Sequence, residues 1–178
     1  MVLTRPVFFV GFMGAGKTSV ARRLARTCRI ASVDMDTYLE RREGRKITEI
    51  FATDGEPGFR AIETDVLREL AAKEDPLLVS CGGGVVVTPE NHEIFAEGGL
   101  VVFLDVTADE ASDRIRDKST RPLFQDLDSA RARCEERRPF YEAVADVTVS
   151  TAGKSVPAIA REVQRILEKE GVLCPQQK

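Results

Sequence analysis

Residues 7–18 of the 178-residue chain read VFFVGFMGAGKT, four strand-forming apolar residues followed by a glycine-rich turn. The part from Gly11 to Thr18 matches GxxxxGK[ST] at every fixed position, and apolar residues recur behind it at helical spacing. A strand, this turn and a helix are the context that a phosphate-binding loop, or P-loop, requires. A chance glycine-rich turn is the alternative, and the strand and helix on either side weaken it. We therefore expect a protein that binds a nucleoside triphosphate.

The chemistry of this loop assigns roles to its residues. Glycines let backbone N–H groups approach polyphosphate oxygens, and the helix N-terminus adds positive potential. Lys17 is expected to reach the β- and γ-phosphates, and the Thr18 hydroxyl to bind Mg²⁺ directly. The residues predicted to contact the triphosphate are Gly14, Ala15, Gly16, Lys17, Thr18 and Ser19.

Further apolar runs predict the rest of the fold. Beside the strand at residues 7–10, strands are expected over residues 30–33, 77–79, 100–104 and 144–149. A helical stretch from Ile47 to Leu70 breaks at residues 55–58, and a closing helix covers residues 156–167. Because helices separate strands that are continuously apolar, we predict an α/β fold with a central parallel five-stranded sheet flanked by helices.

Length and composition disfavour several classes of protein. The chain suits one domain, and 43% hydrophobic with 31% charged residues is typical of globular proteins. A net charge of −3 disfavours nucleic-acid binding, and no apolar run is long enough to span a membrane. The four cysteines are far apart and His92, expected on a surface helix, is the only histidine, so a zinc site is disfavoured. We expect reduced thiols, a cytoplasmic location without a signal peptide, and a monomer.

Two aspartates, Asp34 and Asp36, follow the second predicted strand. Residues i and i+2 of an extended segment point the same way, so both carboxylates are expected to face the crevice at the carboxyl end of the sheet. One carboxylate can order Mg²⁺ and its water, and the other can accept a proton from a hydroxyl nucleophile. The alternative is that Asp36 only caps the next helix.

An arginine and a glycine triplet point to an acceptor site. Arg60 lies three residues before Glu63, so on a helix that carboxylate can hold the guanidinium in position for a substrate carboxylate. The glycines at 82–84 follow the third strand, where bare backbone lets a ligand approach closely. A solvated ion pair and a loose turn are the respective alternatives. Cys81, beside the glycines, is expected to be a small buried residue.

Further basic residues lie in the second half of the chain. The segment from Arg114 to Leu123 is either a solvated loop or a lid that brings Arg121 to the γ-phosphate. Arg137 offers a second anion contact. Asp105, at the end of the fourth strand, is not assigned to Mg²⁺, because the third strand suits the place beside the P-loop strand better and Asp34 already supplies a carboxylate.

In combination these motifs resemble those of the shikimate kinase family. The match runs in order from Gly11 to about Val149 and comprises GFMGAGKTS, the D-x-D at Asp34, GExxFRxxE at Gly55, the triplet GGG, RPL at Arg121 and RxPxY at Arg137. A P-loop alone occurs in many families, whereas this combination is far more specific. The resemblance implies a P-loop kinase fold over residues 1–178, with a substrate-binding segment at about 36–63 and a mobile lid at about 114–127.

The resemblance also implies a reaction, the Mg²⁺-dependent transfer of phosphoryl from ATP to the 3-hydroxyl of shikimate on the route to chorismate and the aromatic amino acids. Asp36 is then the general base, Asp34 holds Mg²⁺ through water, and Lys17 acts on the phosphoryl group. Arg121 acts there from the lid, and Arg114 packs near adenine. The implied shikimate contacts are Asp36, Arg60, Gly82, Gly83, Gly84 and Arg137, with Phe51 and Phe59 as the apolar wall.

Some alternatives stay open. Arg138 adjoins Arg137, so the assignment in RxPxY could slip by one residue, and the adenine loop near residues 153–155 matches weakly. A gluconate kinase would share the P-loop and lid, although FRxxE, GGG and RxPxY are not expected in it. A regulator that has lost catalysis should lack Asp36, Arg60 or Arg121, and all three are present.

Overall fold

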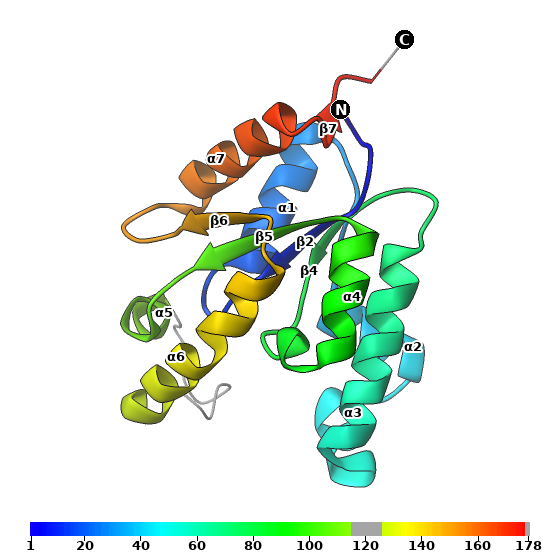
Figure 1. The fold of residues 1–178 in the computed structure, drawn as a ribbon, viewed down its shortest axis with the longest axis vertical. Coiled ribbons are helices and arrows are strands. Elements are labelled where there is room, and N and C mark those ends of the chain that lie inside the picture. Colours follow the sequence, from blue (N-terminus) through cyan, green and yellow to red (C-terminus); the bar gives the residue numbers. More distant parts are fainter. Residues whose placement is uncertain (115–125, 177–178) are drawn as a thin grey trace.

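The computed structural model describes residues 1–114 and 126–176, and its main sheet has five parallel strands (Figure 1). The strand order is β3-β4-β2-β5-β6, and every neighbouring pair is parallel. The bounds are Val7–Val10 for β2, Ser32–Asp34 for β3, Leu78–Ser80 for β4, Leu100–Asp105 for β5 and Val147–Ser150 for β6. The predicted five-stranded parallel sheet is confirmed.

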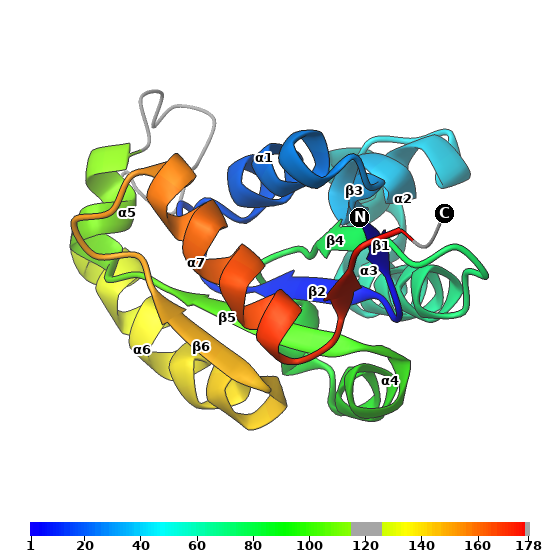
Figure 2. The same ribbon diagram turned by 90° about the horizontal axis from the view of Figure 1, so that it is seen from above.

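Helices cover both faces of this sheet. Figure 2 shows α1 (Lys17–Cys28) and α7 (Val156–Lys169) on one face, and α3 (Ile47–Ala71), α4 (Pro89–Gly98) and α6 (Leu127–Val144) on the other. The remaining helices of the described residues are α2 (Met35–Glu43), α5 (Ala108–Arg114) and the short 3₁₀ helix η1 (Val85–Val87). All four residues of β2 are fully buried, as expected for the central strand of a sheet covered on both sides.

The predicted break in the long helical stretch lies at Gly55 in α3. Its φ of 69° and ψ of −176° are a conformation that essentially only glycine adopts without strain, and Pro57 follows it. Phe51 precedes this kink and Phe59 follows it. The bend brings the two side chains together, and their ring centres lie 4.5 Å apart. The sequence therefore located this bend correctly.

One expectation and one alternative about Asp36 were wrong. Asp36 lies in the first turn of α2 and not in an extended segment, and the residue that caps α2 is Asp34, whose carboxylate accepts from the Thr37 N–H at 3.1 Å. The third predicted strand, β4, lies beside the P-loop strand β2 as expected, but β5 also flanks β2, so sheet position alone gives no reason to leave Asp105 unassigned. Asp105 instead binds Arg138 at 2.7 Å.

Besides the short helices α5 and η1, two parts of the fold had no counterpart in the sequence analysis. One is a small antiparallel sheet that joins β1 (Val2–Leu3) to β7 (Leu173–Cys174) near the two chain ends. The other is α6, whose buried stripe consists of Ala130, Cys134 and Tyr141. These residues are too weakly apolar to give a clear helical pattern, although their spacing fits one face of a helix.

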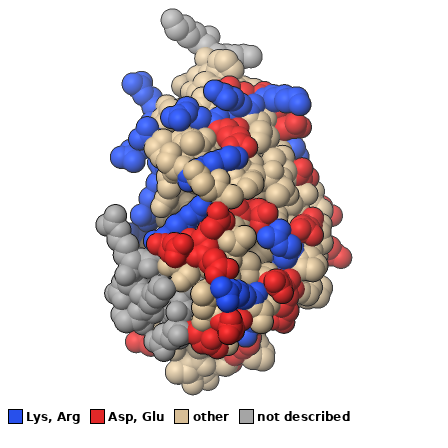
Figure 3. Space-filling view, turned by 90° about the vertical axis from the view of Figure 1, so that its left-hand side faces the viewer, with Lys and Arg blue, Asp and Glu red and all other residues tan. Residues whose placement is uncertain are grey.

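The surface charge is unevenly distributed. Figure 3 shows Lys and Arg side chains gathered at the upper end of one face, the end where α7 lies, and acidic side chains concentrated on its lower half. None of the helices in the described ranges is long and apolar enough to cross a membrane. The four cysteines are free thiols, and Cys28, Cys81 and Cys134 are buried.

Candidate active site

The P-loop links β2 to α1 as the sequence predicted. Gly14 and Gly16 have φ values of 82° and 93°, which favour glycine at both positions. The Lys17 ammonium donates to the carbonyl oxygens of Gly11 at 2.7 Å and Phe12 at 3.2 Å, so it lies folded over the loop. The loop therefore presents a cation and the N-terminus of α1 at one place, which is a site suited to polyphosphate.

Three polar side chains meet beside Lys17, at the carboxyl ends of β3 and β4. The Thr18 hydroxyl donates to Asp34 Oδ2 at 2.8 Å and lies 2.9 Å from the Ser80 hydroxyl. Hydroxyl and carboxylate oxygens are ligands that Mg²⁺ prefers, so this cluster fits such an ion. Ser80 was not singled out from the sequence, although its place directly after a buried strand and before the glycines was a usable signal.

One cavity of about 550 Å³ joins the P-loop to Asp36. Its lining combines the loop residues Gly14, Gly16, Lys17, Thr18 and Ser19 with Asp34, Asp36, Gly82 and Gly83. A phosphate bound on the loop and a hydroxyl bound at Asp36 would therefore share one space. The prediction that both aspartates face one crevice holds, although the local geometry behind it is a strand end followed by a helix turn.

The glycine triplet is closely packed against charged side chains. A Cβ atom on Gly82 would lie 2.9 Å from Asp36 Oδ1 and 3.1 Å from Glu63 Oε1. A Cβ atom on Gly84 would lie 2.6 and 2.7 Å from the terminal nitrogens of Arg60. The glycines thus let these groups approach the backbone, and the alternative of a loose turn is wrong.

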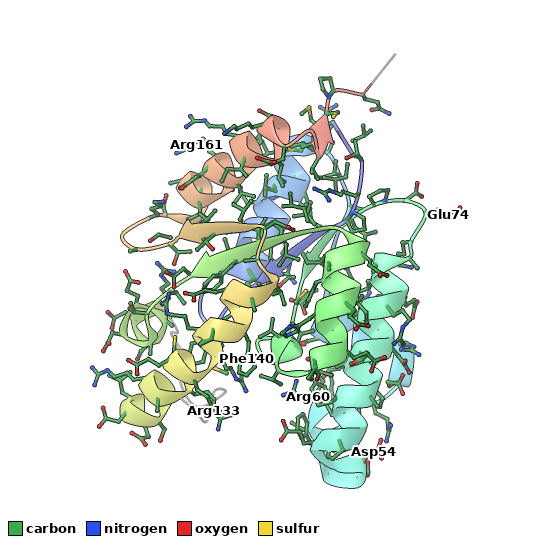
Figure 4. The ribbon with its side chains drawn as sticks, in the orientation of Figure 1. Asp54, Arg60, Glu74, Arg133, Phe140 and Arg161 are labelled. Carbon is green, nitrogen blue, oxygen red and sulfur yellow. The ribbon has the colours of Figure 1, made fainter. Side chains whose placement is uncertain are left out.

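Arg60 forms a largely buried ion pair with Glu63, at 2.5 Å between Nη1 and Oε2. The side chains are 17% and 3% exposed, so this is not a solvated surface pair. Burial raises the pKa of Glu63, and the neighbouring Arg60 charge opposes that shift. The Nε of Arg60 is buried and has no hydrogen-bond partner among the described residues. Figure 4 shows Arg60 projecting from α3 on the side that faces α6.

The two adjacent arginines of the RxPxY segment, both on α6, bind different partners. Arg137 donates to the Gly83 carbonyl at 3.3 Å, whereas Arg138 binds Asp105 at 2.7 Å. Tyr141, which the sequence analysis quoted without a role, is buried and donates to the same Gly83 carbonyl at 2.5 Å. Burial raises the pKa of Tyr141 to about 12. The geometry therefore places Arg137, and not Arg138, beside the glycine triplet.

The two predicted wall residues lie next to Arg60. Phe59 is buried, Phe51 is 40% exposed, and the Arg60 guanidinium carbon lies 5.2 Å from the centre of the Phe59 ring. This is a distance at which a cation–π interaction is favourable. Cys81 is buried as predicted, and burial raises the pKa of its thiol, which keeps it protonated and unreactive.

The far side of the cavity is bounded by Arg114 and Val156. The Arg114 guanidinium donates to Thr151 Oγ1 at 2.9 Å and to the Thr151 carbonyl at 2.7 Å. Thr151 is buried, and the sequence analysis did not identify it as a partner of Arg114. Arg121 and the predicted lid between residues 115 and 125 lie outside the described residues. His92 is on α4 as expected but is half-buried, with Nε2 2.7 Å from the Val86 carbonyl oxygen.

A P-loop at the carboxyl edge of a five-stranded parallel sheet, opening into one cavity with an aspartate, defines the class of P-loop kinases. The model of the family described as shikimate kinase matches residues 13–168. A shikimate kinase of Geobacter metallireducens is 41% identical over 167 residues, 92% of each chain. One from Francisella tularensis subsp. novicida is 33% identical over 177 residues, covering 97% of this chain and 100% of the relative. The chain belongs to the shikimate kinase family.

Solved structures agree with this assignment. The shikimate kinase from Acinetobacter baumannii in complex with shikimate superposes with a TM-score of 0.85 at 32% identity, covering 93% of this chain and 94% of that one. The shikimate kinase from Aquifex aeolicus gives 0.80 at 32% identity, with 95% and 99% covered. A gluconokinase from Sinorhizobium meliloti, at 20% identity and a TM-score of 0.56, shares the fold alone.

Proposed function

We propose that this protein transfers the γ-phosphoryl group of ATP to the 3-hydroxyl of shikimate, giving shikimate 3-phosphate and ADP on the route to the aromatic amino acids. Family membership supports the reaction. The structural observation that carries the proposal is the single cavity lined by Lys17 of the P-loop and by Asp36. An acceptor hydroxyl at Asp36 would be close to a phosphoryl group held by the loop, as in-line transfer requires.

Asp36 is proposed as the general base. Its carboxylate borders the cavity and lies against Gly82, so it can bind an acceptor hydroxyl and take its proton as the oxygen attacks phosphorus. Glu63 is the other carboxylate at the triplet, but it is buried and paired with Arg60. Asp36 is therefore the better placed of the two to exchange a proton.

Arg60 and Arg137 are proposed to bind the shikimate carboxylate. They approach the same glycine triplet from α3 and α6, with Arg60 beside Gly84 and Arg137 on the Gly83 carbonyl. Guanidinium groups suit a planar carboxylate because they offer paired donors. The wall formed by Phe51 and Phe59 completes the proposed contacts with Gly82, Gly83 and Gly84.

The residues proposed to bind the nucleotide lie mainly in the P-loop. Gly14, Ala15, Gly16 and Ser19 would hold the phosphates together with Lys17, while Arg114 borders the far end of the cavity. Thr18 would bind Mg²⁺ directly and Asp34 would hold it through water; bound there, the ion neutralises charge on the β- and γ-phosphates. Arg121 is proposed to reach the γ-phosphate from the lid.

A coupled ADP-release assay with shikimate, quinate and gluconate tests the proposed reaction. Shikimate is expected to be the preferred acceptor, and activity with gluconate alone would overturn the assignment. Asp36→Asn should lower kcat roughly 100-fold or more with little change in the KM for ATP, because it removes the proton acceptor. Lys17→Ala should nearly abolish turnover in a folded protein, because the charge on the transferred phosphoryl is no longer balanced.

The remaining expectations also become proposals. One buried cluster that includes all of β2 and one main sheet support a single domain. The exposed large hydrophobic residues in the described ranges, Val2, Phe51 and Phe140, are too scattered to form an apolar interface, which supports a monomer. Light scattering would test the monomer, and fractionation of cells would test the proposed cytoplasmic location.

A further inference from the structure

A second cavity, of about 230 Å³, lies on the other side of Thr18 and Asp34 from Lys17. The residues of α1 that line it are Thr18, Ala21 and Arg22. The lining residues at the end of β3 and on α2 include Asp34, Thr37, Tyr38 and Arg41. Spacings of three, four and seven residues place side chains on one face of a helix. The cavity is therefore a groove between one face of α1 and one face of α2, and we call it the α1–α2 groove.

The charged side chains that line this groove, apart from Asp34, are Arg22 from α1 and Arg41 from α2. Within the described part of the chain, neither guanidinium has a hydrogen bond or an ion pair. Arginine stays protonated at any ordinary pH, so the groove brings together two positive charges that the described residues do not compensate. A concave surface lined by one sign of charge concentrates counter-ions.

The carboxylates around the groove already have hydrogen-bond or ion-pair partners. Asp34 accepts from the Thr18 hydroxyl at 2.8 Å and from the amide and hydroxyl of Thr37, both at 3.1 Å, so three donors stabilise its charge. The other neighbouring carboxylates are paired as follows: Glu40 with Lys46, Glu43 with Arg42, and Glu69 with Tyr38 and Arg42. None of these pairs involves Arg22 or Arg41, so within the described ranges nothing competes with a ligand for either guanidinium group.

We propose that the α1–α2 groove binds a small phosphoryl dianion between Arg22 and Arg41. Two guanidinium forks match the charge and the oxygen geometry of such a group. The volume is below the range of about 300–1,000 Å³ that drug-sized ligands occupy, which restricts the occupant to inorganic phosphate or a small phosphate ester. This site is distinct from the proposed active site, although Thr18, Asp34 and Ser80 form a wall common to both cavities.

Isothermal titration calorimetry with inorganic phosphate tests the proposal, using the full chain. Mg²⁺, a non-hydrolysable ATP analogue and shikimate are present throughout, so that phosphate cannot report on the P-loop or on the proposed carboxylate site. The wild type is expected to bind phosphate in a salt-sensitive manner, because both arginines are exposed. A parallel titration with glycerol 3-phosphate decides whether the ester or the free anion binds more tightly.

Arg22→Gln and Arg41→Gln keep the side-chain length but remove the charge. Each is expected to weaken phosphate binding about fivefold, the upper range for an exposed charged contact, and the double variant to abolish it. Arg26→Gln is the matched control, because Arg26 is an exposed arginine of α1 that does not line the groove. Absence of phosphate binding to the wild type, or equal losses in all three single variants, would overturn the proposal.

Discussion

Arg137 and Arg138 are neighbours in the chain whose side chains bind different partners. Arg137 donates to the carbonyl of Gly83 in the glycine triplet, whereas Arg138 pairs with Asp105 at the end of β5. Consecutive residues of a helix point about 100° apart, so one residue reaches the cavity and the other does not. At the residue scale, the direction of a side chain therefore decides its role.

Arg137→Ala is predicted to raise the KM for shikimate about 10- to 150-fold and to leave the KM for ATP nearly unchanged. The loss corresponds to one charge-assisted hydrogen bond, worth about 1.5–3 kcal/mol. Initial-rate kinetics with each substrate varied in turn measure both constants. Arg138→Ala is the control and should change the KM for shikimate less than about twofold, with at most ~1 kcal/mol lost in stability. The opposite pattern would show that the assigned register is wrong by one residue.

Tyr141→Phe tests the buried hydroxyl that binds Gly83. The pKa of Tyr141 is raised in the folded protein to about 12, above its ordinary value of 10.0. Because the folded pKa is the higher one, the stabilisation is complete below about pH 10 and is lost as the pH rises through about 12. Between pH 9 and 11 the wild type should therefore lose about 1 kcal/mol more unfolding free energy than the variant. Urea denaturation across this pH range measures the difference, and parallel curves would contradict the prediction.

At the scale of elements, the turn after β4 is where α2, α3 and α6 converge. The Gly82–Gly84 triplet packs against Asp36 from α2, Arg60 from α3 and Tyr141 from α6. Each helix brings one group, and the backbone of the triplet sets their mutual distance. A change in this turn should therefore affect the acceptor site more than the nucleotide site.

Gly84→Ala is predicted to raise the KM for shikimate at least about tenfold while the KM for ATP stays within twofold. The backbone of Gly84 has an ordinary φ of −101°, so the effect comes from space, because the new methyl group would lie 2.6 Å from Arg60 and displace it. The control is the same substitution made in an Arg60→Ala background, where the side chain that the methyl group would displace is already missing. If Gly84→Ala raised the KM for shikimate by the same factor with and without Arg60, displacement of Arg60 would not be the cause.

At the scale of the whole molecule, the segments near the two chain ends pair away from the carboxyl edge of the main sheet (Figure 1). The strands β1 and β7 pair there, and the Thr4 amide donates to the Val172 carbonyl at 3.0 Å. Val172 and Leu173 are buried, so this C-terminal segment contributes two side chains to the core. This pairing therefore adds to the stability of the fold at a place away from the proposed active site.

Deleting residues 172–178 is predicted to lower the unfolding free energy by about 3–5 kcal/mol, because two buried apolar side chains are lost. At low temperature, where the shortened chain remains folded, kcat should be close to that of the full chain. Urea denaturation and low-temperature kinetics test the two parts separately. Deleting only residues 175–178 is the control and should change neither quantity, because Pro175 and Gln176 are exposed.

Much of this protein was determined by short stretches of its sequence. The P-loop, the bend at Gly55 and the five parallel strands each depend on residues close together in the chain, and their patterns were sufficient to predict them. The Arg60–Glu63 pair was predictable for the same reason, because three residues along a helix bring two side chains together.

The tertiary structure decided what depends on distant segments. Asp34 caps α2, Tyr141 reaches Gly83 from 58 residues away, and Thr151 meets Arg114 from 37 residues away. The two arginines of the α1–α2 groove, which have no partner among the described residues, depend in the same way on two helices that pack around β3. A local pattern specifies which face of an element is apolar, but it does not specify which other element will pack there. That choice depends on the free energy of the whole packed core, and it sets the partners of every side chain in the site.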